Sequence, residues 1–496
     1  MKVLFVYPGQ ESLGVESLSA VLRREGHRTQ LAFDPVLFDD SFFFQPQLAG
    51  WLDAGPRIAA QARAFGPDLV AVAILSPFWR WAQRRVAELR EVTGAPVVIG
   101  GPHVSGAPEA ALRGTGADFA IVGEGEGPLA ALVAALDGRG AMEHVPNLLR
   151  WQNGTITRHA LGPFTDVRAL PWADKDLYAG AGPQFRIGYT IATSRGCAMR
   201  CSFCSESLFS GLSEAGDSGF LRRRSVEDVI AELKAAKRSR GFDHVRFYDP
   251  IFAFDRRWLE AFAEAYAAEV GVPYWCLAYP SMLDARTVEA LARSGCFEIQ
   301  MGIQDLNPDT RRQVFGRVET NADVAAAIRR VRDAGIHLAV DNILGTPGQT
   351  PQDVLDAVDF YEDAAPDRLN VYWLTYFPGT TILPTAVEAG DLTDEAVKTL
   401  EEDPTMRAFH INRPAHRGDL HRLFTWLQFS QVLPASARET VKRHRLWRFF
   451  PKSAGPLPTL LAYQARSVRR FAHLESRVTA RYRHYGPKLA AARLGR

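Results

Sequence analysis

The sequence predicts an α/β fold with three parts: an N-terminal doubly wound (Rossmann-like) domain, a partial (βα)6 TIM-like barrel and a C-terminal, mostly helical domain. Two observations support the first two parts. Apolar runs of strand length alternate with helical stretches, and glycine or proline turns separate them. A third observation, a strongly basic C-terminal segment, marks off the last part. We therefore expect domains over residues 1–140, 185–395 and 396–496, with a connector over residues 141–184.

Strand-like runs in the first domain are joined by helical stretches, an arrangement that produces βαβ units and a parallel sheet. The expected strands cover residues 3–7, 29–33, 69–75, 97–100 and 119–122, with helices near 15–25 and 80–92. Ligands of such sheets bind beyond the carboxyl ends of the strands. Those ends carry Ser76, Gly100 with Gly101, and Gly123 with Glu124. Glycine there lets a ligand approach the backbone, although tight turns of any α/β domain also need glycine.

In the connector we expect only one feature, a type I′ hairpin at Asn153 and Gly154. After the connector, strand-like runs again alternate with helical stretches. Six parallel strands are expected at residues 189–193, 244–248, 274–278, 298–303, 337–344 and 369–376. Ser225 and Asp228 resemble a capping box that begins a helix reaching about residue 238. Barrels of this kind place their catalytic groups at the carboxyl ends of the strands.

Three of the five cysteines, Cys197, Cys201 and Cys204, form a Cys-x3-Cys-x2-Cys run. Thiolates select iron–sulfur clusters, zinc or copper(I), and three of them can hold three irons of a [4Fe-4S] cluster. Structural zinc usually needs four protein ligands, and no second pair follows nearby. Disulfides are not expected, because few cysteines in an odd number indicate a reducing cytoplasm. Cys276 and Cys296 stand in apolar surroundings and are expected in the core.

The cysteine run follows an apolar stretch at residues 187–192 and has Phe203 just before its last cysteine, so it resembles the signature of the radical S-adenosylmethionine (SAM) enzymes. With the Gly-Gly-Pro-His turn at 100–103 and the Gly-Glu-Gly-Glu turn at 123–126 upstream, residues 1 to about 395 look like the B12-binding (cobalamin-dependent) radical SAM enzymes, class B methyltransferase-like. The resemblance implies three cofactors: a [4Fe-4S] cluster on the three cysteines, SAM on the open iron, and cobalamin.

The resemblance also implies where SAM is held. The end of the second barrel strand, Tyr248 and Asp249, would approach the amino group of SAM and carry catalytic roles. Gln304 at the fourth strand would reach the ribose or carboxylate, and Gly345 with Thr346 at the fifth would reach the adenine. The family often has Glu at Gln304 and in the slot of Gln349, and either amide can still hydrogen-bond ribose hydroxyls.

Some of these residues have other interpretations. The resemblance also implies that Phe203, just before the last cysteine of the run, is a cofactor-binding residue. Arg195 either pairs with the SAM carboxylate or caps a turn, and Gln304 could be a surface amide. The segment 345–348 could simply be a loop, since Thr350 and Pro351 are typical of a helix start.

On the cobalamin side, the resemblance implies that Ser76, Gly100 and Gly101 contact the corrin or its nucleotide tail, with Gly123 and Glu124 nearby. Many cobalamin domains carry an Asp-x-His-x-x-Gly motif after the first strand that supplies an axial histidine. Residues 7–14 of this chain contain no histidine. We therefore expect no histidine below the cobalt, and we expect His103 to be a turn residue.

The function implied by the resemblance is methylation of an unactivated carbon through a 5′-deoxyadenosyl radical and methylcobalamin. Radical cyclisation, ring contraction or oxidation of a natural product, lipid or tetrapyrrole is the alternative, and a non-catalytic carrier of both cofactors is a different class. A flavodoxin- or ferredoxin-like protein would donate electrons. Five aromatic residues near strand ends either line an apolar substrate pocket or belong to the core; they are Tyr248, Tyr279, Tyr372, Trp373 and Tyr376.

Charge is strongly segregated along the chain, although its total is only +2. Residues 407–496 contain 19 Lys and Arg against three acidic residues, a net charge of +16, so residues 1–406 carry −14. The basic residues near Trp447, Phe449 and Phe450 fit an interfacial helix on an anionic membrane. They equally fit a cover for an anionic substrate, a docking site for an acidic electron donor, or a helical lid on the acidic barrel. Nucleic acid is not expected, since no reading module accompanies the charge.

Location is expected to be cytoplasmic, with peripheral contact to the inner face of the membrane. The first apolar run is too short for a signal peptide and is typical of a first strand. No run of 18 apolar residues predicts a membrane span.

Overall fold

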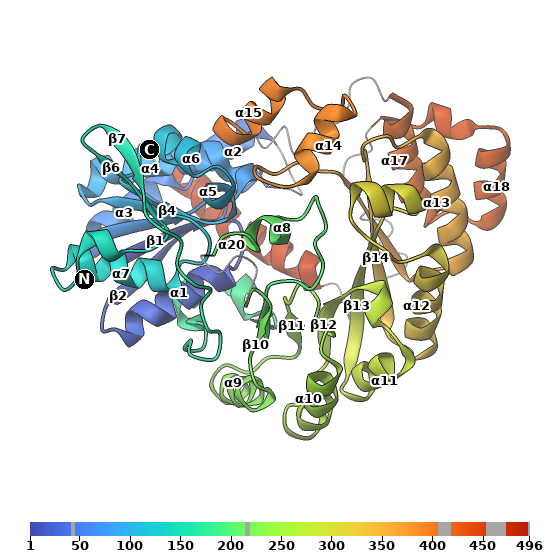
Figure 1. The fold of residues 1–496 in the computed structure, drawn as a ribbon, viewed down its shortest axis with the longest axis horizontal. Coiled ribbons are helices and arrows are strands. Elements are labelled where there is room, and N and C mark those ends of the chain that lie inside the picture. The colour runs from blue at the N-terminus through green and yellow to red at the C-terminus, as the bar shows by residue number, and fades with distance from the viewer. Residues whose placement is uncertain (41–44, 214–218, 405–417, 453–472, 495–496) are drawn as a thin grey trace.

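The computed structural model describes residues 1–40, 45–213, 219–404, 418–452 and 473–494, and these contain two large β-sheets surrounded by helices, with a small two-stranded sheet (Figure 1). In the first sheet the strand order is β2-β1-β3-β4-β5-β6-β7, with the first five strands parallel. Its strands are β1 (Lys2–Pro8), β2 (Arg28–Asp34), β3 (Leu69–Ala73), β4 (Val97–Gly100), β5 (Phe119–Ile121), β6 (Leu148–Gln152) and β7 (Thr155–Arg158). The doubly wound fold is therefore confirmed.

Helices lie between the strands of this sheet. They are α1 (Leu13–Arg24), α2 (Pro46–Trp51), α3 (Gly55–Phe65), α4 (Trp79–Thr93), α5 (Pro102–Gly106), α6 (Pro108–Thr115) and α7 (Glu126–Leu136), with short helices η1 (Ser76–Phe78), η2 (Met142–His144), η3 (Lys175–Tyr178) and η4 (Pro183–Arg186). Strands β1 and β3 are neighbours, but the chain continues from them in opposite directions across the sheet. β1 is followed through α1 by β2, whereas β3 is followed through α4 by β4 on the other side of the pair. Such a switch point leaves a crevice at the carboxyl ends of the strands, which is where ligands of these folds bind.

The hairpin of β6 and β7 turns at Asn153 and Gly154, whose φ angles of 51° and 78° agree with the expected type I′ turn. β6 pairs antiparallel with β5, so the hairpin extends the first sheet. Two strands of this sheet thus come from residues that the sequence places in the connector.

The second sheet has six parallel strands in the order β15-β14-β13-β12-β11-β8. They are β8 (Tyr189–Ile191), β11 (Val245–Phe247), β12 (Tyr274–Ala278), β13 (Cys296–Gln304), β14 (His337–Leu344) and β15 (Arg368–Trp373). All six expected strands are present, and the partial barrel is confirmed. A two-stranded ladder of β9 (Ser194–Arg195) and β10 (Arg222–Arg223) lies beside it.

Helices cover the outside of this barrel (Figure 1). They are α9 (Val226–Ser239), α10 (Arg256–Glu269), α11 (Ala285–Arg293), α12 (Asn321–Asp333) and α13 (Pro351–Ala364), with η5 (Pro280–Met282) and a π-helical turn, η6 (Thr310–Val314). Helices α8 (Ser205–Phe209), α14 (Ile382–Glu388) and α15 (Asp394–Glu402) lie between the barrel and the first domain instead. Ser225 accepts a hydrogen bond from the Asp228 amide and begins α9 as expected. Cys276 and Cys296 are buried in the barrel core, in agreement with the sequence.

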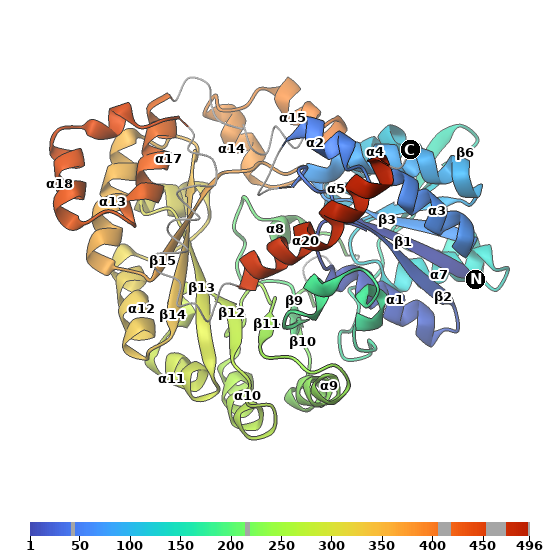
Figure 2. The ribbon, with the colours of Figure 1, turned by 180° about the vertical axis from the view of Figure 1, so that it is seen from behind.

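The C-terminal segment is divided between the two sheets. Helices α17 (Gly418–Ser430) and α18 (Ala435–Arg443), with the short helix η7 (Leu446–Phe449), pack on the barrel, and their Trp426 and Trp447 belong to its core. Helix α20 (His473–Leu494) instead packs against the first domain, whose core includes Tyr485 (Figure 2). Residues 405–417 and 453–472 of the basic segment lie outside the described residues.

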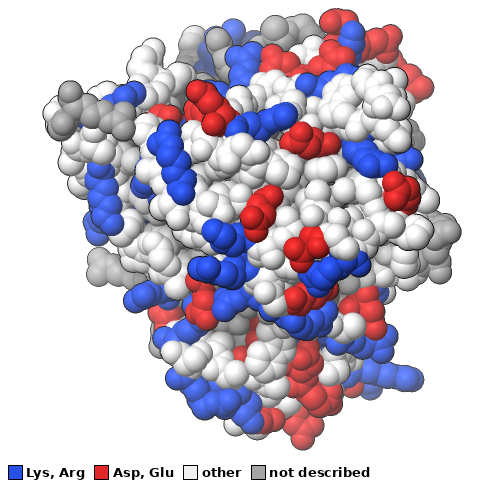
Figure 3. Space-filling model, turned by 90° about the vertical axis from the view of Figure 1, so that its left-hand side faces the viewer, with Lys and Arg blue, Asp and Glu red and all other residues white. Residues whose placement is uncertain are grey.

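Several basic residues of the C-terminal segment pair with acids elsewhere in the chain. Arg438 lies 3.0 Å from Glu362 and Lys442 lies 2.5 Å from Asp359, both acids on α13. These contacts agree with a helical lid on the acidic barrel. On the side of the molecule formed by the first domain, basic and acidic side chains are interspersed (Figure 3). Within the described ranges no helix combines the length and the apolar character that a bilayer crossing requires.

Candidate active site between the two domains

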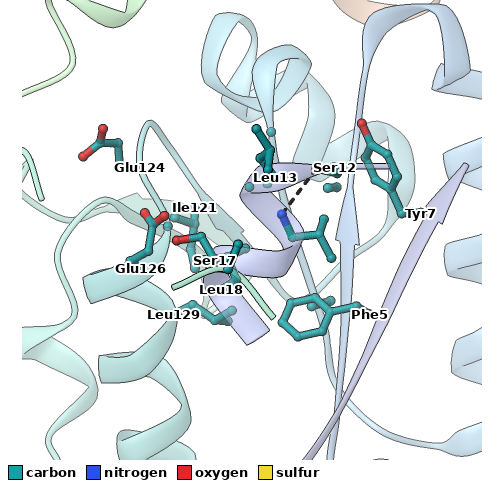
Figure 4. A pocket seen from close by; sticks show the side chains of 18 of the residues that line it. Phe5, Tyr7, Ser12, Leu13, Ser17, Leu18, Ile121, Glu124, Glu126 and Leu129 are labelled. Carbon is teal, nitrogen blue, oxygen red and sulfur yellow. Dashed lines mark hydrogen bonds between the residues drawn. The ribbon is translucent and has the colours of Figure 1, made fainter. Parts of the chain in front are cut away.

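A cavity of about 440 Å³ lies between the carboxyl ends of the first sheet and the beginning of the barrel. Figure 4 shows its first-domain wall, where Leu13, Ser17 and Leu18 of α1 lie opposite Phe5 and Tyr7 of β1. The barrel contributes residues just before the cysteine loop: Ile191, Ala192, Ser194 and Arg195. The cavity thus lies at the switch point of the sheet and touches the segment that leads to the three cysteines.

The expected glycines lie around this cavity. Gly100, Gly101 and Gly123 all line it. Gly101 has a φ of 101°, and a Cβ atom there would lie 2.9 Å from the Ile74 carbonyl oxygen, so the turn itself already requires glycine. Glycine-lined strand ends around an apolar cavity fit a flat macrocycle that approaches the backbone, and these residues therefore fit the implied cobalamin.

Ser76 is not among the residues that line the cavity; its neighbour Leu75 is. The Ser76 hydroxyl lies 3.0 Å from Nδ1 of His103, and both side chains are buried. His103 also packs on Trp79, with ring centroids 4.7 Å apart. Burial lowers the pKa of His103 to about 4, so the ring is neutral near pH 7. His103 was expected in a turn but lies in the short helix α5, and it is not among the residues that line the cavity.

Arg195 and Glu124 line the cavity, but each is engaged in ion pairs across the two domains. Arg195 pairs with Glu126 and lies 3.5 Å from Glu124, while Arg222 lies 2.7 Å from Glu124. Burial opposes the charge of Arg195, but the two carboxylates outweigh it and raise the pKa of the guanidinium. Arg195 therefore joins the cysteine-loop segment to the first domain. Sequence reasoning missed Glu126 and Arg222, since their contacts join residues far apart in the chain.

The cysteine loop begins at Gly196, which has a φ of 80°. A Cβ atom there would collide with the carbonyl oxygen of Phe220, so only glycine fits. Burial raises the pKa of the Cys197 thiol to about 11 and that of Cys204 to about 12. The nearby charges of Cys197 and Cys201 contribute to the shift at Cys204.

Among the described residues, no three His, Cys, Asp or Glu side chains converge closely enough to form a metal site, and this includes the three cysteines. The three thiols nevertheless lie in one loop, near enough for their charges to interact. A cation among them would favour the thiolate forms, and binding would release protons. Three soft donors in one loop fit the implied [4Fe-4S] cluster.

Asp249 is fully buried behind the segment that leads to this loop. Its carboxylate accepts hydrogen bonds from the Thr193 amide at 3.0 Å, the Thr193 hydroxyl at 2.7 Å and the Ser194 hydroxyl at 2.5 Å. All of these donors belong to the chain itself, so the structure uses Asp249 to position the loop. The adjacent Tyr248 is 46% exposed, and its ring lies 5.2 Å from that of Trp275.

The ends of β13 and β14 carry the residues expected near SAM. Gln304 has a φ of 74°, at a point where the register between the two strands shifts. A Cβ atom on Gly302 would collide with the Gln304 amide, so that amide lies against the Gly302 backbone. Non-glycine residues with positive φ are uncommon and often functional.

Gly345 and Thr346 belong to a loop that is fixed by two side chains. Gln349 accepts a hydrogen bond from the Gly345 amide at 2.8 Å and donates one to Asp305 at 3.1 Å. The Thr346 hydroxyl also donates to Asp305 at 3.1 Å. Burial raises the pKa of Asp305 to about 6. The expected helix start follows at once, since Thr350 begins α13 with a complete capping box.

Sequence reasoning also missed Arg317, a buried cation beside the cysteine loop. Its Nη1 lies 3.9 Å from Sγ of Cys201, and its Nη2 donates to the Gly302 carbonyl at 2.6 Å. Glu319 pairs with it at 2.6 Å. Phe203 packs on Phe315 with ring centroids 4.6 Å apart, which ties the cysteine loop to the same segment. No local pattern reveals Arg317, because only the fold brings it near the cysteines.

The five aromatic residues near strand ends divide into two groups. Tyr279 and Tyr376 are buried, and Trp373 stacks on Phe424 of α17, so these three belong to the packing of the molecule. Tyr248 and Tyr372 are about half exposed at the ends of β11 and β15. Only the second pair is accessible to a substrate.

Comparison with known protein families divides the chain into the two parts seen in the structure. The model of the radical SAM superfamily matches residues 191–361, which contain the cysteine loop and the four barrel strands β11 to β14. The model of the B12 binding domain matches residues 6–133, which contain the strand ends around the cavity. The chain thus combines a radical SAM domain with a B12-binding domain.

Curated relatives extend over most of the chain. An uncharacterized methyltransferase of Pyrococcus horikoshii is 25% identical over 433 residues, which cover 83% of this chain and 89% of that protein. Cytidylyl-2-hydroxyethylphosphonate methyltransferase of Streptomyces wedmorensis is 22% identical over 433 residues, or 77% of this chain and 79% of that protein. Among solved structures, the cobalamin-dependent SAM radical enzyme OxsB, with aqua-cobalamin and SAM bound, has the same fold: the TM-score is 0.68 at 13% identity, over 99% of this chain and 84% of that one.

Proposed function

We propose that this chain, a radical SAM protein with a B12-binding domain, methylates an unactivated carbon atom of a small molecule. One observation carries the proposal: a single cavity is bounded by the strand ends of the B12-binding domain and by residues 191–195, which lead into the cysteine loop. A methyl carrier in this cavity would lie beside the place where the radical is made. The names of the curated relatives, both methyltransferases, support the same reaction.

In this proposal Cys197, Cys201 and Cys204 hold the cluster, while Gly100, Gly101 and Gly123 surround cobalamin. When bound, the cluster supplies the electron that cleaves SAM to a 5′-deoxyadenosyl radical, and cobalamin supplies the methyl group. The chain supplies position, charge and exclusion of water. Asp249 fixes the backbone of Thr193 and Ser194, and through them the direction of the cysteine loop.

Two charged or polar groups would orient SAM. Arg317 is a buried guanidinium beside Cys201, so it would attract the carboxylate of SAM to that side of the loop. Gln304, held in a left-handed conformation at the strand bulge, would present its amide to the ribose. The loop of Gly345 and Thr346 is fixed through Asp305 and would form the wall next to the adenine.

The substrate would enter at the barrel ends of β11 and β15, where Tyr248 and Tyr372 are exposed. We propose that a reduced flavodoxin- or ferredoxin-like protein of the cytoplasm donates the electron. A peripheral contact with anionic membrane would involve Phe449, which is 82% exposed, whereas Trp447 is buried in the barrel core and is not accessible to lipid. Co-sedimentation with anionic liposomes tests that contact, and protein left in the supernatant would refute it.

The test of the reaction is anaerobic turnover of the reconstituted protein with SAM, cobalamin and a reductant, using natural-product and lipid intermediates as substrates. We expect 5′-deoxyadenosine, S-adenosylhomocysteine and a product heavier by one methylene group. Absence of 5′-deoxyadenosine would overturn the radical reaction altogether. Deoxyadenosine without S-adenosylhomocysteine or methylated product would overturn methyl transfer and favour cyclisation or oxidation. Cys204→Ala should abolish every product, whereas Cys276→Ala, a core cysteine far from the loop, should not.

A further inference from the structure

The basic C-terminal helix α20 returns to the loop after β1, more than 460 residues earlier in the chain. Figure 2 shows α20 running from the barrel side of the molecule along the first domain. The loop, as defined here, comprises Pro8, the last residue of β1, and residues 9–12, which lead to α1. This is the stretch that carries an axial histidine in many cobalamin domains and lacks one here.

Arg477 makes the first connection. Its Nη1 lies 2.9 Å from Oε2 of Glu11 in the loop, while its Nε and Nη2 donate to the Ile187 carbonyl at 3.0 and 2.7 Å. Ile187 comes just before β8 of the barrel. The Arg477 side chain is only 14% exposed, so these hydrogen bonds form away from water. One guanidinium therefore holds the loop and the start of the barrel together.

One helical turn later, Arg481 makes the second connection. Its Nη1 donates to the carbonyl oxygen of Gly9 at 2.7 Å, and it pairs with Asp40. Gly9 has a φ of 78°, a conformation that other residues adopt only with strain. Arg481 thus binds the backbone of the loop at the residue where the chain turns. The Arg481 side chain is also buried.

Glu11 is held by three side chains. Besides Arg477, it accepts hydrogen bonds from Lys175 at 2.9 Å and from the Thr190 hydroxyl at 2.7 Å, and Lys175 also pairs with Glu16 at 2.6 Å. Burial raises the pKa of Glu11, but Lys175 and Arg477 outweigh it and lower this pKa to about 2. Without Arg477, two buried carboxylates would share a single lysine. Such an uncompensated buried charge is strongly unfavourable.

The loop connects this cluster to the cavity. Tyr7 at its start and Ser12, Leu13 and Gly14 at its end all line the cavity. Ser12 also accepts the hydrogen bond that begins α1. A displacement of Gly9 or Glu11 would therefore move four cavity residues.

From these contacts we infer that α20 is a working part of the cobalamin site, in which Arg477 and Arg481 are positioning residues that fix the loop of residues 8–12 against the cavity. The inference rests on the B12-binding domain and not on methyl transfer. It also gives the basic C-terminal segment a second role, distinct from the lid that α17 and α18 form on the barrel.

The test uses the full chain in the form without cobalamin, titrated with hydroxocobalamin and followed by absorbance. Arg477→Gln and Arg481→Gln should each bind about 10-fold more weakly, the range found when residues behind a ligand are removed. Arg483→Gln is the matched control, because Arg483 lies on the same helix and is exposed. Unchanged affinity for hydroxocobalamin in the double variant, Arg477→Gln with Arg481→Gln, would overturn the inference.

A second readout separates positioning from general stability. The electron paramagnetic resonance spectrum of bound cob(II)alamin reports the surroundings of the cobalt. We expect this spectrum to change in the glutamine variants and to match that of the wild type in Arg483→Gln. Weaker binding with an unchanged spectrum would overturn the positioning role.

If the double variant fails to fold, Arg477→Lys and Arg481→Lys keep the charge but lose the forked donor, and the same two outcomes apply to them. Neither measurement depends on SAM cleavage, so a failed methyl transfer leaves the result intact.

Discussion

Asp249 is expected from the sequence to carry a catalytic role, and in the structure its side chain contacts the segment that leads to the cysteine loop. Its buried carboxylate accepts hydrogen bonds from the Thr193 amide, the Thr193 hydroxyl and the Ser194 hydroxyl. Hydrogen bonds to a buried charge are among the stronger ones in a protein. The cysteine loop begins two residues after Ser194, so the direction of the loop depends on this carboxylate.

Asp249→Asn should therefore reduce cluster assembly. The new side chain loses the charge that strengthens these hydrogen bonds, and its NH2 group, in the place of Oδ2, would lie against the Thr193 amide, a cost on the order of 2 kcal/mol. We expect iron and sulfide per chain after anaerobic reconstitution to fall several-fold. Asp255→Asn is the control, since Asp255 begins α10 and asparagine caps a helix equally well. Wild-type iron content in Asp249→Asn would contradict the positioning role.

Because His103 is buried, we predict that the free energy of unfolding depends on pH. Its pKa in the folded protein is about 4, whereas an unfolded histidine titrates near 6.5. The unfolded chain thus takes up a proton at a higher pH than the folded one, so stability is full above about pH 6.5 and falls as the pH drops toward 4. Between pH 7 and pH 5 the contribution of His103 should lower the free energy of unfolding by about 2 kcal/mol.

Urea unfolding of the protein without cofactors at pH 7 and pH 5 measures this loss. His103→Asn retains a partner for Ser76 but cannot take up a proton, so the difference between the two pH values should shrink by about 2 kcal/mol. His144→Asn, at an exposed histidine, should leave the difference as in the wild type. An equal pH dependence in wild type and His103→Asn would contradict the buried, neutral state of the ring.

Among the elements, the loop between β14 and α13 is fixed by Gln349, at a position where the family resemblance leads to an expectation of glutamate. Here Gln349 bridges the Gly345 amide and the Asp305 carboxylate, and only an amide can both accept and donate in this way. Glutamate would place two carboxylates in contact within a buried site.

Gln349→Glu should therefore weaken SAM binding, although it restores the residue that is common in the family. The pKa of Asp305, already raised to about 6 by burial, would rise further beside a second carboxylate. At pH 8 both groups are charged and repel; below pH 6 Asp305 is protonated and can donate. We expect about 10-fold weaker binding at pH 8 and a smaller effect at pH 6, measured by calorimetry on the protein with its cluster.

The double variant Asp305→Asn with Gln349→Glu is the control for this effect, because the new asparagine can donate where Gln349 did. It should bind SAM more tightly than Gln349→Glu alone at pH 8. Equal affinity in the two variants would show that the carboxylates do not interact.

The elements were largely predictable, whereas the contacts between them were not. All six barrel strands and the Asn153–Gly154 turn follow from local periodicity and turn chemistry, and the structure contains them. The cysteine loop and the glycine turns follow from short motifs. Arg317 and Arg477 act through contacts with residues more than 100 positions away, which no local pattern encodes. Ser76 was expected near cobalamin because it ends a strand, but its hydroxyl is directed to His103 instead.

At the scale of the whole molecule, the segregated charge of the sequence becomes a set of ion pairs. The basic C-terminal segment contacts acids of both halves: Lys442 pairs with Asp359 on the barrel, and Arg481 pairs with Asp40 on the first domain. The acidic first 406 residues and the basic remainder thus neutralise one another along the surfaces where they meet. Salt should screen the partly exposed pair of Lys442 and Asp359 more than the buried pair of Arg481 and Asp40.

A substitution at Arg195 should show how far the cluster site and the cobalamin site depend on each other. It lies directly before the cysteine loop, yet its guanidinium pairs with Glu126 and Glu124 of the B12-binding domain. Arg195→Gln would leave Glu126 buried without its cation, at a cost of about 3 kcal/mol or more, and would release the loop from the cavity wall. Cobalt and iron per chain, measured together by mass spectrometry after reconstitution, should both fall.

Adding Glu126→Gln to Arg195→Gln should recover part of both metal contents, because the uncompensated charge is removed. Arg113→Gln, at an exposed pair within α6, should change neither. A variant that loses only one metal would show that the two sites are independent, since a shared wall must transmit the damage to both.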